Sequence, residues 1–238
     1  MRSVADLLSR PEPTPRPGET LRWSRFLAST RAEGPGLRSA LWVQGCSVRC
    51  PGCFNPQLWA EAGARLDQTH AVARDLVARS VDAGVEGITL LGGEPFDQAE
   101  ALAEVAAAYR SAGLTVMTFS GYTLEALSTW ARERSDVAAL LGATDLLVDG
   151  PYLRDRPDAH RPWLGSTNQG IRALTPVYAD AVAQIEQAAP STGDSVEIRI
   201  GVDGRIDVNG WADAAALAAL LDDLGTRADG PFRKENTQ

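Results

Sequence analysis

The sequence predicts an α/β protein with a parallel sheet whose helices lie outside it. Two patterns support this class: short apolar segments typical of buried strands alternate with segments of helical periodicity, and glycines or other turn-forming residues separate them. The composition agrees, because 44% hydrophobic and 23% charged residues in a chain of 238 are typical of a globular protein. A chain of this length can bury one large core without disulfide bonds.

Two strands that can pair as a hairpin begin the predicted domain. They span residues 21–29 and 37–43 and flank the turn-rich segment 32–36. A helix is expected next at 69–83, where apolar residues recur with helical spacing as far as Gly84. The alternation then continues with strands at 87–91, 115–119 and 145–148 and with helices at 98–112 and 124–134.

The C-terminal part of the chain has a different pattern. Residues 196–200 and 205–208 are strand-like and are joined by a glycine-containing turn, which predicts a hairpin that closes the edge of the sheet. An Ala- and Leu-rich helix is expected at 212–224. We expect one domain over residues 21–225, a flexible proline-rich tail at 1–20 and a flexible tail at 226–238.

The charge balance argues against a nucleic-acid partner. The chain carries 23 Lys and Arg against 31 Asp and Glu, a formal net charge of −8, which repels a phosphate backbone. No stretch is apolar enough for a signal peptide or a membrane-spanning helix. We therefore expect a cytoplasmic protein without a membrane partner.

The three cysteines of the chain, Cys46, Cys50 and Cys53, lie within one short segment. An odd number of thiols with the spacing C-x3-C-x2-C favours a metal centre over a set of disulfides. Three thiolates could bind zinc with His70 or His160 as fourth ligand, or hold a 4Fe-4S cluster with one iron left open. The spacing alone leaves both readings in place.

Polar or glycine-rich residues follow successive predicted strands. The cysteines follow the second strand, Gly92-Gly93-Glu94-Pro95 follows the third, and Ser120 and Asp149 follow the next two. Ligands gather where parallel strands end, because groups from several strands converge there. Glycines let the backbone approach a ligand closely, and the Glu94 carboxylate could meet an ammonium group. The sequence thus predicts a ligand site at this edge of the sheet.

The string GCSVRCPGCFNPQLW, which begins at Gly45, resembles the cluster-binding loop of radical S-adenosylmethionine (SAM) enzymes, and in particular that of the proteins that activate anaerobic ribonucleotide reductase. One position departs from the wider pattern. Gly52 stands where most radical SAM enzymes have an aromatic residue, and Phe54 follows the third cysteine instead. The resemblance covers roughly residues 21–210. It implies a partial (β/α)6 TIM-like barrel with N-terminal and C-terminal hairpin additions, in which the three cysteines hold one 4Fe-4S cluster.

The same resemblance implies where SAM would bind. Gly92 to Pro95 is similar to the motif that contacts the methionine amino group, and the segments that contain Ser120 and Asp149 resemble activase segments. A further segment is similar to a Gly-Ser-x-Asn-Gln-Arg sequence of the family, which makes Asn168 and Gln169 weaker candidates for contacts to the cofactor or a partner.

That last segment departs from the family at one position. Gly170 stands where the arginine is expected, and Arg172 lies two residues later. The role of the family's arginine is therefore not carried over to this chain.

The resemblance implies reductive cleavage of SAM to a 5′-deoxyadenosyl radical, which would take a hydrogen atom from a glycine of a separate glycyl radical enzyme. A low-potential donor such as flavodoxin or ferredoxin would supply the electron. Two alternatives remain at this point: an enzyme of the same lineage that modifies a small metabolite or a peptide, and a zinc-binding scaffold without enzymatic activity. No side chain is expected to act as an acid, base or nucleophile.

Overall fold

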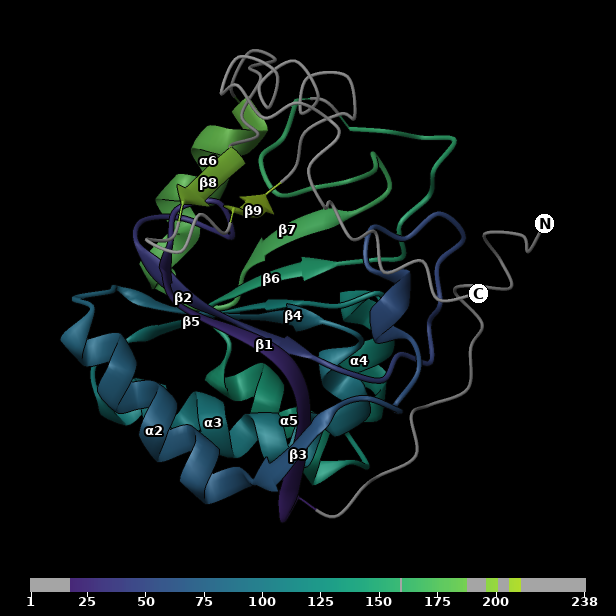
Figure 1. The fold of residues 1–238 in the computed structure, drawn as a ribbon. Coiled ribbons are helices and arrows are strands. Elements are labelled where there is room, and N and C mark those ends of the chain that lie inside the picture. Colours follow the sequence, from purple (N-terminus) through teal and green to yellow (C-terminus); the bar gives the residue numbers. More distant parts are fainter. Residues whose placement is uncertain (1–17, 159, 188–195, 201–205, 211–238) are drawn as a thin grey trace, which may run out of the picture.

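The computed structural model describes residues 18–158, 160–187, 196–200 and 206–210. The strands in these ranges are β1 (Thr20–Thr30), β2 (Arg38–Val43), β3 (Arg65–Gln68), β4 (Gly87–Gly92), β5 (Thr115–Phe119), β6 (Leu146–Asp149), β7 (Gly170–Ala173), β8 (Val196–Ile200) and β9 (Ile206–Gly210). The helices are α2 (Thr69–Asp82), α3 (Ala99–Ser111), α4 (Leu124–Trp130), α5 (Ser135–Ala143) and α6 (Ala179–Gln187), with short 3-10 turns η1 (Pro56–Leu58), η2 (Pro95–Gln98) and η3 (Pro176–Tyr178). Figure 1 shows α2, α3 and α5 together on one face of the large sheet and α6 on the other. The protein is a mixed α/β structure, as the sequence predicts.

Four neighbouring strands of the large sheet are parallel. The strand order is β3-β1-β2-β4-β5-β6-β7, in which β2, β4, β5 and β6 pair in parallel. On one side β1 and β3 extend the sheet in antiparallel fashion, and on the other side β7 pairs antiparallel with β6. Parallel neighbours bring their carboxyl ends to one edge of the sheet, which we call the carboxyl edge. The opposite edge, where these four strands begin, is the amino edge.

The N-terminal hairpin forms as predicted, with Trp23 of β1 opposite Val43 of β2. The C-terminal hairpin of β8 and β9 also forms, but the expectation that it closes the edge of the sheet is wrong. The outermost strands of the large sheet are β3 and β7, and β8 and β9 form a separate two-stranded sheet. A hydrogen bond of 2.9 Å, which the Asn209 side chain of β9 donates to the Thr30 hydroxyl of β1, joins the two sheets. The helix expected at 212–224 lies outside the described residues, as do residues 1–17 and 226–238.

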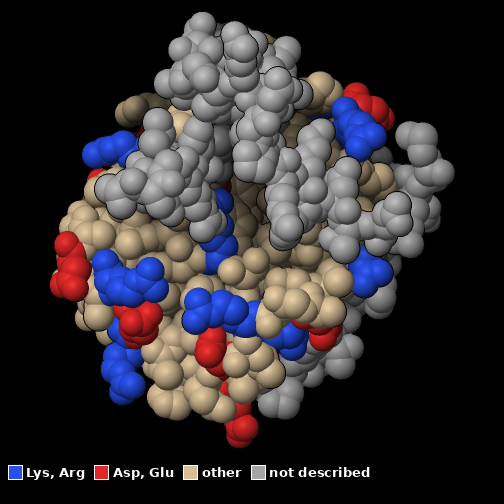
Figure 2. All heavy atoms as spheres, in the orientation of Figure 1, with Lys and Arg blue, Asp and Glu red and all other residues tan. Residues whose placement is uncertain are grey.

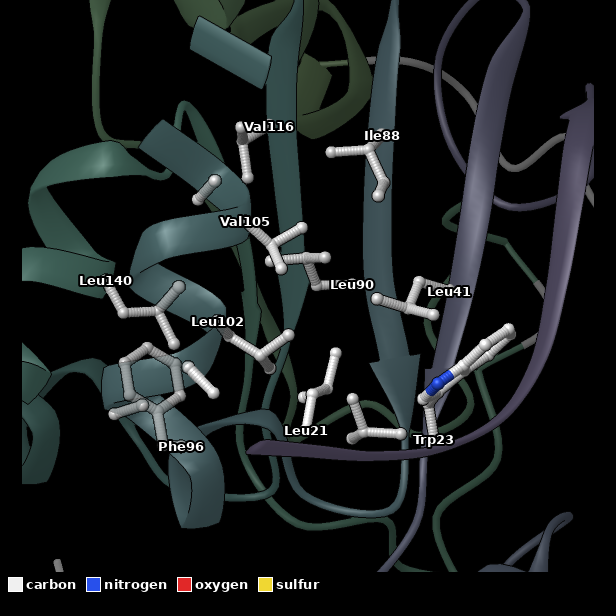
Figure 3. Packing of buried hydrophobic residues seen from close by; sticks show 14 of the residues in the cluster. Leu21, Trp23, Leu41, Ile88, Leu90, Phe96, Leu102, Val105, Val116 and Leu140 are labelled. Atoms are coloured by element: carbon white, nitrogen blue, oxygen red, sulfur yellow. The ribbon is translucent and has the colours of Figure 1, made fainter. Parts of the chain in front are cut away.

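The main core lies between the large sheet and helices α2, α3 and α5. Ile88 and Leu90 lie two residues apart on β4, so their side chains point to the same face of the sheet, and both are fully buried. Leu102 and Val105 lie three residues apart on α3 and so share one face of that helix. Figure 3 shows these four side chains packed between β4 and α3. Each fully buried Leu, Ile or Val stabilises the fold by about 1.5–3 kcal/mol. The packing therefore fixes β4, whose last residue begins the glycine motif.

Helices α2 and α3 end within two residues of the positions that the sequence predicts, whereas α4 ends earlier. The helix expected at 124–134 ends at Trp130, whose ring packs edge-on against Tyr122 with the ring centroids 4.7 Å apart. The chain then turns, and α5 begins at Ser135, where the Arg134 guanidinium pairs with Asp136 in the first turn. The sequence also does not predict α6, β3 and β7. The two strands have four residues each and lack an alternating apolar pattern.

Charges of both signs lie next to one another on the face of the molecule seen in Figure 2. Ion pairs of this kind include Arg65 with Asp67 and Arg79 with Asp75. Within the described part of the chain, no helix is both long and apolar enough to cross a membrane.

Candidate functional site

The cysteine segment forms a loop at the carboxyl end of β2, and backbone hydrogen bonds close it. Gly45 N–H donates to the Leu58 carbonyl over 2.9 Å, and Cys46 N–H donates to the Trp59 carbonyl over 3.1 Å. Within the loop, Cys53 N–H donates to the Cys50 carbonyl over 3.0 Å. The start of the loop is thus pinned to the residues that follow it, and all three cysteines lie between these fixed points.

None of the three cysteines forms a disulfide, and all three lie against the core. Cys50 is buried, and Cys46 and Cys53 are partly buried and pack against the main hydrophobic cluster. Backbone N–H groups approach two of the sulfur atoms at 3.4 Å: that of Arg49 points to Cys46, and that of Asn55 points to Cys53. Such N–H to sulfur contacts favour thiolate ligands. A set of three sulfur donors on one loop, backed by apolar residues, fits an iron–sulfur cluster.

The alternative zinc site would need a fourth protein ligand beside the three cysteines. Among the described residues, no group of three or more His, Cys, Asp or Glu is arranged to hold a metal ion, so neither His70 nor His160 completes a tetrahedral site with the thiols. In a 4Fe-4S cluster each cysteine ligates a different iron, so the three sulfur atoms do not have to meet at one point. The three cysteines supply the number of protein ligands that a 4Fe-4S cluster with one open iron requires.

The electrostatic surroundings of Cys46 disfavour a bare thiolate. Burial raises the pKa of Cys46 to about 12, and the nearby carboxyl groups of Glu94 and Asp97 contribute to the rise. Cys46 is therefore protonated in the absence of a metal. Metal ligation would have to displace this proton, as is general for thiolate ligands.

Gly92 and Gly93, at the end of β4, lie so close to the backbone of Val43 and Gly45 that a side chain would not fit. A Cβ on Gly92 would lie 2.5 Å from the Val43 carbonyl oxygen, and one on Gly93 would lie 2.2 Å from the Gly45 carbonyl oxygen. The N–H groups of Gly93 and Glu94 donate to these same two carbonyls, over 2.8 and 2.9 Å. The close approach expected toward a ligand is made here toward the end of β2. The glycine pair thus joins the end of β4 to the start of the cysteine loop.

Glu94 joins the ends of β4 and β5. Its side chain is 1% exposed and accepts three hydrogen bonds: from Phe96 N–H at 3.0 Å, from Ser120 Oγ at 2.9 Å and from Gly121 N–H at 2.8 Å. Burial raises the pKa of Glu94 to about 8, and the negative charge of Asp97 adds to the rise. Pro95 follows as the first residue of η2. The structure therefore brings Glu94 and Ser120 into direct contact.

Asp149 lies at the end of β6, where its carboxylate is 6% exposed. It accepts a hydrogen bond from Leu124 N–H at the start of α4, over 2.8 Å, and pairs with Arg172 of β7 over 3.1 Å. The Arg172 guanidinium lies directly against Gly170: a Cβ added to Gly170 would be 2.5 Å from Arg172 Nη2. The absence of a side chain at 170 thus makes room for the arginine two residues later.

Asn168 and Gln169 hold their own loop. Asn168 donates to the Pro151 carbonyl over 2.7 Å. Gln169 accepts from Gly165 N–H at 2.9 Å and donates to the Gly150 carbonyl at 3.0 Å. These bonds give both side chains a structural role within the loop that follows β6, and their contact with a cofactor stays a prediction.

That loop nevertheless touches the cysteine loop. The rings of Phe54 and Tyr152 lie with centroids 4.9 Å apart, and the Cβ that Gly52 lacks would lie 2.3 Å from Arg154 Nε. Gly52 also has a φ of 85°, which favours glycine. Arg154 therefore covers Gly52, the position at which an aromatic residue is usual, and any side chain at position 52 would displace the arginine.

Sequence reasoning missed a network directly beside the first cysteine. Ser47 donates through its backbone N–H and its hydroxyl to the carboxylate of Asp97, over 2.7 Å in both cases. The Tyr122 hydroxyl lies 2.5 Å from Ser47 Oγ. The available signal was the position of Ser47 next to Cys46 and of Asp97 three residues after Glu94, but sequence alone does not bring the two together.

Comparison with known proteins adds a second line of evidence. The chain matches the family described as 4Fe-4S single cluster domain over residues 32–172, a stretch that contains the whole site. It is 32% identical over 149 residues to the anaerobic ribonucleoside-triphosphate reductase-activating protein of Vibrio cholerae, covering 60% of this chain and 91% of that protein. Proteins of the same description from Escherichia coli K12 and Enterobacteria phage T4 are 29% and 26% identical, over 59% and 65% of this chain and 91% and 96% of theirs.

Proposed function

The chain belongs to the 4Fe-4S single cluster domain family and to the anaerobic ribonucleoside-triphosphate reductase-activating proteins, and from this premise we propose that it is a radical SAM enzyme that activates a glycyl radical enzyme. The observation that carries the proposal is the loop at the end of β2 that bears three cysteines outside any disulfide, hydrogen-bonded to the buried Glu94 motif at the end of β4. The matched family stretch contains both.

The cofactors supply the chemistry when they are bound: an electron from the cluster cleaves SAM into methionine and a 5′-deoxyadenosyl radical, which takes a hydrogen atom from a glycine of the partner. The chain itself binds the cofactors and orients them. Cys46, Cys50 and Cys53 would hold three irons and leave the fourth without a protein ligand, as in the family it belongs to.

The residues at the carboxyl edge are proposed to seat SAM. Gly92, Gly93, Glu94 and Pro95 would face its methionine end, and a neighbouring ammonium group would favour the charged form of Glu94 over the protonated one. Ser120 holds the Glu94 carboxylate through a 2.9 Å hydrogen bond, and Asp149 contributes a second buried carboxylate at the end of β6. Asn168 and Gln169 would act indirectly, by shaping the loop that lies against the cysteines.

Further parts of the proposal concern the surroundings of the enzyme. The protein substrate is a glycyl radical enzyme, and a low-potential flavodoxin or ferredoxin supplies the electron in the cytoplasm. We also propose that the domain spans residues 21–225 and is a partial (β/α)6 barrel. The four adjacent parallel strands support the barrel, and the antiparallel β1, β3 and β7 are additions to it.

Anaerobic reconstitution tests the proposal. The purified chain is loaded with iron and sulfide, reduced with dithionite and supplied with SAM, and 5′-deoxyadenosine is measured by chromatography. We expect about four irons and four sulfides per chain and formation of 5′-deoxyadenosine. A chain that binds zinc but no iron or sulfide, or that binds a cluster without cleaving SAM, would contradict the proposal.

The substrate is tested separately. Extract of the native host is passed over the immobilised reconstituted chain under argon, and the retained proteins are identified by mass spectrometry. The proposed function expects a large protein that acquires a glycyl radical signal in electron paramagnetic resonance (EPR) spectra when it is incubated with the loaded chain, dithionite and SAM. A radical on a small metabolite or a peptide instead would favour the alternative substrate.

A further inference from the structure

Three side chains from three different strand ends meet beside the first cysteine. Ser47 follows Cys46 in the loop after β2, Asp97 lies in η2 after β4, and Tyr122 follows β5. Asp97 Oδ2 accepts from Ser47 N–H and Asp97 Oδ1 accepts from the Ser47 hydroxyl, both at 2.7 Å. The Tyr122 hydroxyl donates to Asp97 Oδ1 at 3.3 Å. One carboxylate therefore holds the residue next to a cysteine by two bonds.

The surrounding residues fix this network in place. Tyr122 is 4% exposed and packs edge-on against Trp130. The next residue of the cysteine loop, Val48, is buried and sits over Gly121, where an added Cβ would lie 2.8 Å from its side chain. The half of the loop between Cys46 and Cys50 is thus clamped to η2 and to the end of β5. A charge on Asp97 is held at a fixed place beside the cysteines.

We propose that Asp97 is a positioning residue for the cluster, which fixes the loop through Ser47 and keeps the reduction potential of the bound cluster low through its negative charge. This inference rests on the proposed function. Reduction adds one electron to the cluster, and a fixed anion nearby opposes this addition. Charges and hydrogen bonds in the surroundings of an iron–sulfur cluster tune its reduction potential in this way. A low potential suits the proposed reaction, because only a strong reductant can transfer an electron to the sulfonium of SAM and cleave it.

The charge and the hydrogen bonds can be separated by two substitutions. Asp97→Asn keeps the shape of the side chain and can still accept from Ser47 N–H and donate to its hydroxyl, but it is neutral. Tyr122→Phe removes a hydroxyl from the same network and leaves the carboxylate charged. If the charge matters, only the first substitution moves the potential; if the network matters only for structure, both act alike.

The measurement is an anaerobic redox titration of the reconstituted full-length chain, followed by the EPR signal of the reduced cluster. In the Asp97→Asn variant we expect the ratio of reduced to oxidised cluster at a fixed potential to rise about tenfold, a positive shift of about 59 mV for a one-electron couple. In the Tyr122→Phe variant we expect a change below about twofold. A ratio in Asp97→Asn within about twofold of the parent, or an equal shift in both variants, would overturn the inference.

A second matched pair covers the case in which Asp97→Asn does not take up a cluster. Asp97→Glu keeps the charge and Asp97→Ser removes it, so the first should titrate near the parent and the second at a more positive potential. Equal potentials in this pair would refute the inference while the proposed function stands. A parent chain that takes up no 4Fe-4S cluster would instead refute the proposed function, and the inference with it.

Discussion

The two edges of the same parallel strands are built in opposite ways. At the amino edge, Arg38 is fully buried and each of its guanidinium nitrogens donates a hydrogen bond: Nε to Thr89 at 3.0 Å, Nη1 to the Tyr178 hydroxyl at 2.7 Å and Nη2 to the Ile88 carbonyl at 2.7 Å. At the carboxyl edge, the backbone N–H groups of Arg49 and Asn55 lie 3.4 Å from the sulfur atoms of Cys46 and Cys53.

The difference separates stability from function. The amino edge is a network of protein groups that satisfy one another, and burial lowers the pKa of Arg38 without a direct carboxylate partner in the described residues. At the carboxyl edge, buried groups such as Glu94 and Cys46 have strongly raised pKa values, which are typical of sites that bind charged ligands. Substitutions at the amino edge should therefore change folding but not cofactor binding, whereas those at the carboxyl edge should change cofactor binding, alone or together with stability.

Removal of a cysteine ligand should have the largest effect. In Cys50→Ala we expect the iron content to fall below that of an intact cluster and the formation of 5′-deoxyadenosine to drop by more than about 100-fold, because one iron loses its only protein ligand. The measurement is iron and sulfide content with SAM cleavage under argon. A Cys50→Ala variant that cleaved SAM at the parental rate would refute the ligand assignment.

Removal of the buried arginine should act on folding. In Arg38→Met we expect the free energy of unfolding to fall by about 2–4 kcal/mol, because the Thr89 hydroxyl and the Ile88 carbonyl lose a buried donor. Denaturant titration of the cluster-free chain measures this loss. At a temperature where the variant is folded, its cluster content should equal that of the parent. A variant with parental stability but no cluster would reverse the assignment of the two edges.

Glu94 should give the stability of the cluster-free chain a pH dependence. Its pKa is raised from 4.5 to about 8 in the folded state, so the folded state binds the proton more tightly than the unfolded state does. Stability is therefore highest below pH 4.5 for this group and is lost as the pH rises through 8, by an amount on the order of 5 kcal/mol.

The test compares the parent with Glu94→Gln, which does not titrate. The difference between their unfolding free energies should change steadily between pH 5 and 8. Glu33, whose pKa burial raises to about 7, contributes equally to both chains and so cancels. A difference that is constant over this range would show that Glu94 is ionised in the folded chain.

The loop after β6 should give the smallest effect. Gln169→Ala removes the hydrogen bonds that the side chain accepts from Gly165 and Ser166 and the one that it donates to the Gly150 carbonyl, and we expect a loss of about 1 kcal/mol that is confined to the loop. Hydrogen exchange should quicken at residues 150–169 and stay unchanged in β4. If exchange in the cysteine loop quickened by as much, the two loops would form one cooperative unit.

The sequence predicted the elements and the site where local pattern decides them. The spacing of Cys46, Cys50 and Cys53 and the turn at Gly92 depend on neighbouring residues only, and the strands β2, β4, β5 and β6 are short segments rich in apolar residues. What the sequence could not show depends on tertiary contacts. The pairing of β3 with β1 and the bond between Ser47 and Asp97 join segments that are distant along the chain.

The glycines show the same limit. The sequence predicts that Gly93 lets the backbone approach a ligand; the structure shows a close approach to the Gly45 carbonyl, and contact of Gly93 with SAM stays a prediction. A glycine in a loop indicates close approach and does not say what approaches.

The most direct measurement of the central claim is the EPR spectrum of the dithionite-reduced, reconstituted chain recorded with and without SAM. Three cysteine ligands leave one iron accessible, so SAM should change the g-values of a 4Fe-4S signal that is present in both samples. A spectrum that SAM leaves unchanged, or a reconstituted chain with no such signal, would contradict the claim that the loop at the end of β2 presents an open iron to this cofactor.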